Sequence, residues 1–233
     1  MTGDTPSSRC VKGLFNLYKA AYPDPAALSP ESAWCPFESE MMIMYAIELF
    51  FDHPFEQYVR EIWKGLNEEN ISSNMYEIVE LRPHITLAVY NDISDLETYK
   101  ERFYSFFGSV SSIEIKFDVL AVFPTTGTLF FGPTVTEDLI SMHKQYHKEF
   151  SDLLEYEDRY YIPGNWDPHC TLAIKLSAEQ AVEAMKYCYK DFRPQRGKIV
   201  EAGVVKLGYD SNNRLSSPTV YSVSIVGERG MAN

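Results

Sequence analysis

Two short segments of the sequence carry the same arrangement of residues that transfer protons. Residues 83–89 read PHITLAV and residues 168–174 read PHCTLAI, so five of the seven positions are identical. Side chains on a β-strand alternate between its two faces. In each segment the histidine, the threonine and the alanine therefore share one face. We predict that each segment is a strand that buries its apolar face and presents an imidazole and a hydroxyl to a ligand.

The two pairs, His84 with Thr86 and His169 with Thr171, fit the chemistry of a phosphodiester. Displacement at phosphorus needs one group that removes a proton from the attacking oxygen and another that protonates the leaving oxygen. Histidine, whose ordinary pKa is about 6.5, can perform either task near neutral pH. Hydroxyl groups can donate to the non-bridging oxygens, where negative charge accumulates. The sequence therefore predicts that His84 and His169 are catalytic and that Thr86 and Thr171 hold the phosphate, with no metal and no cofactor.

The repeat decides between a functional and a structural reading of these residues. A single histidine on an apolar strand is more often partly buried with a structural hydrogen bond. Packing alone has no need to repeat both the histidine and the threonine, so the second copy favours function. The two histidines lie 85 residues apart, about half of the chain after its first 40 residues. This spacing predicts a duplicated, two-lobed domain.

Paired His-x-Thr-Leu segments in two similar halves resemble the 2H phosphoesterase superfamily, which includes the 2′-5′ RNA ligase-like proteins and the cyclic phosphodiesterases. The resemblance covers residues 41–226, and the approach YIPGNWDPH at residues 161–169 is similar to the bacterial RNA ligase-like branch. It implies a bilobal α+β fold with a central cleft. It also implies metal-independent cleavage of 2′,3′-cyclic phosphates, related cyclic phosphodiesters or 2′-5′ linkages, and some members join RNA ends. The resemblance does not assign which histidine is the base.

The elements that must position the two segments alternate between strand and helix patterns. Residues 53–69 have apolar residues at helical spacing with Pro54 in the first turn, and Ser94-x-x-Glu97 reads as a capping box. The mixture predicts an α+β, bilobal duplicated fold, with two mainly antiparallel sheets and outer helices around a central cleft. We expect strands at 41–51, 82–90, 112–123, 128–135, 170–176, 198–208 and 219–226, and helices at 53–69, 94–107, 136–155 and 177–189.

The first part of the chain differs from the rest. Five of the thirteen prolines fall within residues 1–36, and only residues 11–22 have the spacing of a short amphipathic helix. We therefore divide the chain into an N-terminal extension, residues 1–40, packed on or tethered to the domain, and a phosphoesterase-like domain, residues 41–233. The extension has no counterpart in the family, and it could cover part of the cleft or bind a partner.

Charge and hydropathy restrict the partners. The chain has 21 Lys and Arg against 33 Asp and Glu, a net charge of −12. Proteins that hold long nucleic acid neutralise many phosphates with Lys and Arg, so we expect a nucleotide or short RNA substrate and no long duplex. The longest apolar run, residues 41–51, contains Glu48 and is too short to cross a bilayer, and no secretion signal is recognisable. We predict a cytoplasmic protein with no membrane partner, and the oligomeric state stays open.

Three further residues are predicted to contact substrate. Tyr161 and Trp166 precede the second motif and could stack on a base, and Arg82 could meet phosphate as a charged donor. Loop packing for the aromatic rings and solvation for the arginine are the alternatives. His143 and His147 have a spacing that can bind zinc, but Lys144 stands where a zinc protease needs glutamate.

For several other polar residues we predict a structural or surface position and no role in chemistry. We expect His143 and His147 to be exposed on a helix, Cys170 to be buried, and the acidic run at residues 155–158 to be solvated surface. The leading prediction is a metal-independent phosphodiesterase. Alternatives are a nucleotide or RNA sensor that uses the same cleft without turnover, an RNA 2′-5′ ligase, and a scaffold whose N-terminal extension binds a protein. Complete motifs in both halves argue against the scaffold.

Overall fold

The computed structural model describes residues 44–225. The predicted extension at residues 1–40 and its helix at residues 11–22 lie outside the described residues. The boundary between the extension and the domain therefore stays a prediction.

The described strands form one antiparallel sheet. Its order is β2-β1-β6-β3-β4-β5, and β7 and β8 also pair with β6. The predicted α+β class and antiparallel pairing are confirmed, but the expectation of two sheets is wrong. The strands are β1 (Met44–Phe51), β2 (His84–Tyr90), β3 (Ile113–Phe123), β4 (Thr128–Pro133), β5 (Cys170–Ala173), β6 (Gln195–Tyr209), β7 (Leu215–Ser216) and β8 (Thr219–Ser224).

The length of β6 explains why there is a single sheet. This strand has 15 residues. Its later part pairs with β1 from Ile199 to Leu207, and its first part pairs with β3 from Gln195 to Ile199. One strand therefore spans both halves and joins the two sets of strands that the sequence suggested would be separate.

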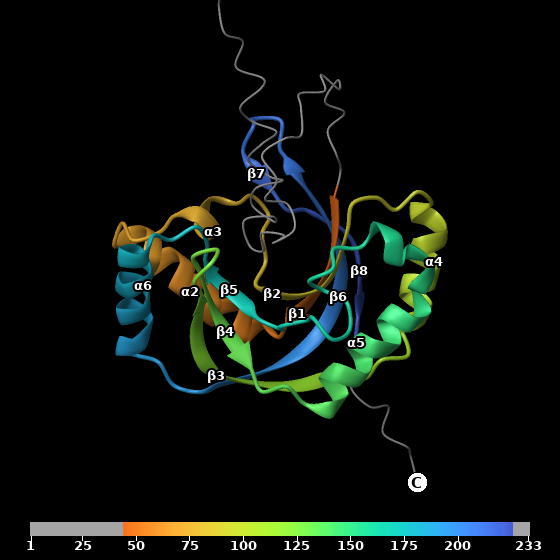
Figure 1. Ribbon diagram of the computed structural model, residues 1–233, viewed down its shortest axis with the longest axis horizontal. Helices are drawn as coiled ribbons and strands as arrows, with labels where there is room; N and C mark the ends of the chain where they lie inside the picture. The colour runs from red at the N-terminus through yellow and green to blue at the C-terminus, as the bar shows by residue number, and fades with distance from the viewer. Residues whose placement is uncertain (1–43, 226–233) are drawn as a thin grey trace, which may run out of the picture.

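The two motif strands end the strand order and still lie close together. The sheet curves into a trough (Figure 1), so β2 and β5 come into contact across its inside. The Cys170 thiol on β5 hydrogen-bonds with the backbone of His84 on β2. In the strand order, β2 lies beside β1 in the way that β5 lies beside β4. This symmetry agrees with the predicted duplication, which itself stays a prediction.

The helices flank the trough, with α2 and α6 on one side and α4 and α5 on the other (Figure 1). Helix α4 starts after Asp95, whose carboxylate accepts from the Thr98 N–H, so Ser94 is not the cap. Of the described helices, none is long and apolar enough to cross a membrane. The helices are α2 (His53–Glu68), α3 (Asn74–Glu77), α4 (Leu96–Phe107), α5 (Glu137–Glu149) and α6 (Ala178–Lys190), with a 3-10 turn at Ser151–Tyr156.

The core lies between the sheet and these helices. On β2, Ile85 and Leu87 are fully buried, whereas His84 and Thr86 are only partly buried. On β5 the same alternation buries Cys170 and Leu172 around the partly buried Thr171. The period-two pattern of the sequence therefore anchors each strand through its aliphatic side chains and leaves the polar ones on the other face.

Candidate active site

The four motif side chains line one pocket. His84 and Thr86 come from β2, Thr171 comes from β5, and His169 is the residue immediately before β5. The pocket has a volume of about 800 Å³, including the space open at its mouth. The structure thus brings together the four residues that the sequence singled out, while their catalytic roles stay predictions.

Both imidazoles are oriented in the same way. The Nδ1 of His84 lies 2.6 Å from the carbonyl oxygen of Arg82, and the Nδ1 of His169 lies 2.7 Å from that of Asp167. A carbonyl oxygen can only accept, so Nδ1 carries the hydrogen in each ring. The lone pair of a neutral ring is then on Nε2. A proline between the carbonyl and the histidine in each motif favours the extended backbone that starts these turns.

Burial favours the neutral form of both rings. It lowers the pKa of His84 to about 4, and it also lowers the pKa of His169. A proton on His169 lowers the pKa of His84 further, so the two rings interact electrostatically. Phosphodiester chemistry needs one ring neutral and the other protonated. At neutral pH the pocket therefore needs a nearby negative charge, or a shared proton, to keep one of the two rings protonated.

A tryptophan holds the backbone at each motif threonine. The indole N–H of Trp166 donates to the carbonyl oxygen of Thr86 at 2.9 Å. The indole N–H of Trp63, on α2, donates to the carbonyl oxygen of Thr171 at 3.1 Å. These bonds satisfy backbone acceptors next to the pocket and restrain the two threonines.

The predicted substrate-binding residues lie in different places. Tyr161 is 6% exposed and lines the pocket. Trp166 does not line it, because its ring stacks on His143 with centroids 4.0 Å apart and an interplanar angle of 3°. For Trp166 this placement favours packing over the predicted contact with a base.

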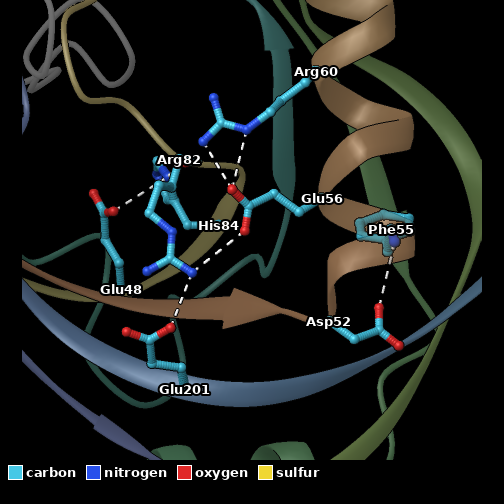
Figure 2. Close-up of polar contacts among 8 residues, drawn as sticks. All are labelled: Glu48, Asp52, Phe55, Glu56, Arg60, Arg82, His84 and Glu201. Atoms are coloured by element: carbon cyan, nitrogen blue, oxygen red, sulfur yellow. Dashed lines mark hydrogen bonds and ion pairs between the residues drawn. The ribbon is translucent and has the colours of Figure 1, made fainter.

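The Arg82 side chain also lies away from the pocket lining. Its guanidinium binds Glu56 at 3.3 Å and Glu201 at 3.0 Å (Figure 2). The guanidinium also lies over the Phe50 ring, 3.9 Å from its centroid. The guanidinium therefore has two carboxylate partners of its own. What Arg82 contributes to the site is its carbonyl oxygen, which orients His84.

Glu48 is a pocket residue that the sequence did not indicate as functional. Its side chain is 1% exposed, and its Oε2 lies 3.3 Å from the Nδ1 of His84 (Figure 2). Its Oε1 has no hydrogen-bond partner among the described residues. Burial raises the pKa of this carboxyl well above its usual value, and Arg82 opposes that shift. The available signal was one glutamate inside an otherwise apolar strand.

The expectation that His143 and His147 are exposed is wrong. They are 2% and 7% exposed. Glu157 is also 7% exposed, so the assignment of the acidic run at residues 155–158 to solvated surface is wrong for Glu157. These side chains form a buried chain. His147 Nδ1 contacts Glu157, His147 Nε2 lies 3.0 Å from His143 Nε2, and His143 Nε2 donates to the carbonyl oxygen of Tyr161 at 2.7 Å.

This buried chain anchors the loop that precedes the second motif. His143 bonds the backbone of Tyr161 and stacks on Trp166, so one helical residue restrains two positions of the loop. Burial lowers the pKa of His143 to about 4, which keeps the ring neutral. Within residues 44–225, no three His, Cys, Asp or Glu side chains gather where they could hold a metal ion. Cys170 is buried as predicted, and burial raises the pKa of its thiol.

Comparison with known proteins identifies the fold and the family. A family model described as the 2′-5′ RNA ligase superfamily matches residues 51–210, a range that includes both motifs. No curated protein matches the sequence. Escherichia coli LigT in its apo form is similar in structure, with a TM-score of 0.52 and 11% identity over 78% of this chain and 97% of LigT.

Two further solved structures share the fold. The protein TT0787 of Thermus thermophilus has a TM-score of 0.52 and 14% identity over 79% of this chain and 99% of its own. E. coli LigT complexed with 3′-AMP has a TM-score of 0.50 and 12% identity over 79% of this chain and 98% of its own. At these identities the structural likeness shows the fold, and the family model carries the evolutionary relationship.

Proposed function

The chain belongs to the 2′-5′ RNA ligase superfamily, as the resemblance of its motifs predicted, and we propose that it is a metal-independent phosphodiesterase. Membership of this family indicates phosphodiester chemistry in general. The observation that best supports the proposal is the meeting of two His-x-Thr pairs in one pocket. We assign the two histidines to proton transfer and the two threonines to the phosphate.

The pocket favours a small phosphodiester over a highly charged ligand. Its described lining contains no lysine or arginine. The lining is largely apolar, which suits a nucleoside carrying a single negative charge. A protein of this fold, E. coli LigT, has been solved with 3′-AMP. We therefore propose 2′,3′-cyclic nucleotides, 2′-5′-linked nucleotides or short RNA ends as the substrate class, in agreement with the chain's net charge of −12. The apolar part of the lining is formed by Met75, Ile78, Leu81, Phe123, Ile174, Leu207 and Leu215.

The proposed reaction uses the Nε2 atoms of the two rings. One neutral imidazole takes a proton from the attacking water or hydroxyl while the new P–O bond forms. The other, protonated, gives a proton to the sugar oxygen as its bond to phosphorus breaks. The hydroxyls of Thr86 and Thr171 donate to the non-bridging oxygens. General acid and base help of this kind accelerates a reaction by about 10²–10⁴-fold per group.

Turnover of a substrate panel tests the proposal. Purified protein is incubated with 2′,3′-cyclic nucleotides, 2′-5′ oligoadenylates and cyclic dinucleotides, with and without EDTA. We expect at least one to be cleaved in EDTA, and we expect His84→Ala and His169→Ala each to lower kcat by about 10²-fold or more while the circular dichroism spectrum is unchanged. Turnover that requires an added metal ion, or that survives in the double alanine variant, would refute the mechanism.

The same panel separates the alternatives. A ligand that binds with micromolar affinity but is recovered intact after long incubation would identify a sensor without turnover. Joining of RNA ends bearing a 2′,3′-cyclic phosphate and a 5′-hydroxyl would identify a ligase. Either result would replace hydrolysis as the function of this pocket.

A further inference from the structure

The two motif histidines differ in one neighbour. His84 has the Glu48 carboxyl 3.3 Å from its Nδ1, whereas His169 lies against the rings of Phe123 and Phe130, with centroids 5.2 and 5.3 Å away. Sheet register produces the difference. Glu48 on β1 pairs with Thr86, and Phe130 on β4 pairs with Thr171. Equivalent positions beside the two motifs therefore carry a carboxyl in one case and a phenyl ring in the other.

Glu48 cannot be an ordinary ionised carboxylate. It is 1% exposed, and its Oε1 has no hydrogen-bond partner among the described residues. The guanidinium of Arg82 is already bound by two other carboxylates. Isolated negative charge at such a position is costly. The site therefore favours one proton in this region, on the carboxyl itself or on the imidazole next to it.

We propose that Glu48 and His84 together hold one proton, so that His84 protonates the leaving oxygen and His169 removes the proton from the attacking water. Glu48 is then a positioning residue, because it acts through the imidazole of His84. This inference rests on the proposed function, since it assigns the two roles of that reaction. Among the described residues no carboxyl contacts the His169 ring; burial lowers the pKa of His169 and outweighs the charge of the nearby Asp167, which raises that pKa. The His169 ring is therefore neutral, and its Nε2 lone pair is free to accept.

The electrostatics of the pair agree with one shared proton. Burial raises the pKa of Glu48 and lowers the pKa of His84, so each group favours its uncharged form. With the carboxyl protonated and the ring neutral, the pair carries one proton and no net charge. A phosphate at Nε2 favours the form in which His84 is an imidazolium and Glu48 is its counter-charge.

Other titratable and charged groups face the pair from each neighbouring element. The positive charge of Arg82, and a proton on His169, both disfavour a second proton on the pair. The carboxylates on α2 and β6 neutralise the guanidinium, and the thiol on β5 touches the backbone of His84. None of these groups contributes a carboxyl to either imidazole. The groups are Arg82, Glu56, Glu201, His169 and Cys170, and Asp167 acts on the His169 ring through its charge without contacting it.

The proton inventory of the step is balanced. Water loses a proton to His169 Nε2 as its oxygen bonds to phosphorus. The bond from phosphorus to the sugar oxygen breaks, and that oxygen takes the proton from His84 Nε2. The products are a phosphomonoester, an imidazolium at His169 and a neutral His84 beside the Glu48 carboxylate. Exchange with solvent returns the proton to the pair.

The first test is the pH dependence of kcat/KM for a 2′,3′-cyclic nucleotide in Glu48→Gln, which keeps the side-chain shape. We expect its basic limb to move to lower pH by about one unit or more, with a loss of about 10-fold or more at pH 7.5 that shrinks as the pH falls. The matched control is Glu56→Gln, which changes the partner of Arg82 without touching His84, and its basic limb should stay in place. A basic limb unmoved in Glu48→Gln would overturn the proposal.

The second test assigns the acid by changing the leaving group. A p-nitrophenyl ester of a nucleotide releases a stable anion that needs no proton. On this substrate we expect His84→Ala to lose at least 10-fold less kcat than it loses on the cyclic nucleotide, whereas His169→Ala should lose the same on both. Equal losses for His84→Ala on the two substrates would overturn the assignment.

The third test does not require turnover, so it separates this proposal from the proposed function. The Glu48 carboxyl carbon and the His84 ring nitrogens are followed by NMR as the pH is varied. We expect the carboxyl to titrate well above its ordinary pKa, and we expect the His84 ring to sense that step in the wild-type protein and not in Glu48→Gln. A Glu48 carboxyl that is ionised at pH 5 beside a neutral His84 ring would disprove the shared proton, even if phosphodiesters are cleaved.

Discussion

Trp166 donates its indole N–H to the backbone carbonyl of Thr86, across 80 positions of sequence. The loop before the second motif is thereby tied to the strand that carries the first. Trp63 makes the corresponding bond to Thr171. Each half of the pocket is therefore supported by an indole from outside its own strand. We expect a change in either indole to alter the position of the motif threonine and to lower the rate.

Replacing Trp166 by phenylalanine tests this support. Trp166→Phe keeps a ring to stack on His143 but leaves the Thr86 carbonyl without its donor. We expect a loss of about 1–2 kcal/mol in the free energy of unfolding, as for other unsatisfied partly buried acceptors, and a several-fold fall in kcat. Urea denaturation and initial rates measure the two effects. Trp63→Phe is the matched control for the other motif. An unchanged kcat in both variants would mean that the indole bonds do not position the site.

The threonine hydroxyls should matter to the rate more than to folding. Thr86→Val and Thr171→Val preserve the branched shape and remove one donor each. Because the donor would stabilise charge on the phosphate in the transition state, we expect kcat to fall by about 10- to 100-fold. Thr86→Ser and Thr171→Ser should restore most of it. A rise in KM with kcat unchanged would show that the hydroxyls bind the ground state and the transition state equally and so do not accelerate the chemical step.

Acid should destabilise the protein through its buried histidines. The pKa of His143 in the folded state is lowered to about 4, below the ordinary value. Between pH 6.5 and 4 the unfolded chain therefore takes up a proton that the folded one does not, and stability falls as the pH falls. His143→Phe removes this contribution. We expect its free energy of unfolding to decrease less on acidification than that of the wild type, by about 1–2 kcal/mol between pH 6.5 and 4.5. Parallel pH curves would contradict the buried neutral state.

Arg82→Met separates substrate binding from structural support. The guanidinium lies outside the pocket lining and holds Glu56 and Glu201 together. We expect the variant to lose about 1–2 kcal/mol of stability with KM for a cyclic nucleotide changed by less than about two-fold. The exposed Arg159 supplies a control, since Arg159→Met should alter neither quantity. An increase of ten-fold or more in KM would instead support the predicted contact with phosphate.

Most element types could be predicted from local patterns, and their ends could not. Helices α2 and α6 each lie within one residue of the ranges expected, 53–69 and 177–189, and Ser177 caps the start of α6. Helix α5 stops at Glu149, six residues before the expected end, and the chain continues as a 3-10 turn. Phe150, at the junction, is 1% exposed. That ring is buried by contacts with distant parts of the chain, and the spacing of apolar residues along one helix cannot predict such contacts.

The candidate site divides in the same way. Alternation along a strand predicted that His84 shares a face with Thr86, and His169 with Thr171. The prediction was possible because the face on which a side chain lies depends only on its position within a short segment. Glu48 and His143 could not be recognised, since their importance depends on which strand pairs with β2 and which loop covers α5. Arg82 and Trp166 have side chains that could bind a phosphate or a base. In the structure, however, they contact residues from distant segments, Glu56 and His143 respectively.

By itself the amino-acid sequence determined that two strands would each offer an imidazole and a hydroxyl on one face, because period-two alternation and apolar content act over a few residues. Only the tertiary structure decided that these faces share a pocket and that one imidazole has a buried carboxyl beside it. The reason is physical: contacts between segments far apart in the chain depend on how the whole sheet curves, and no short stretch of sequence encodes that curvature.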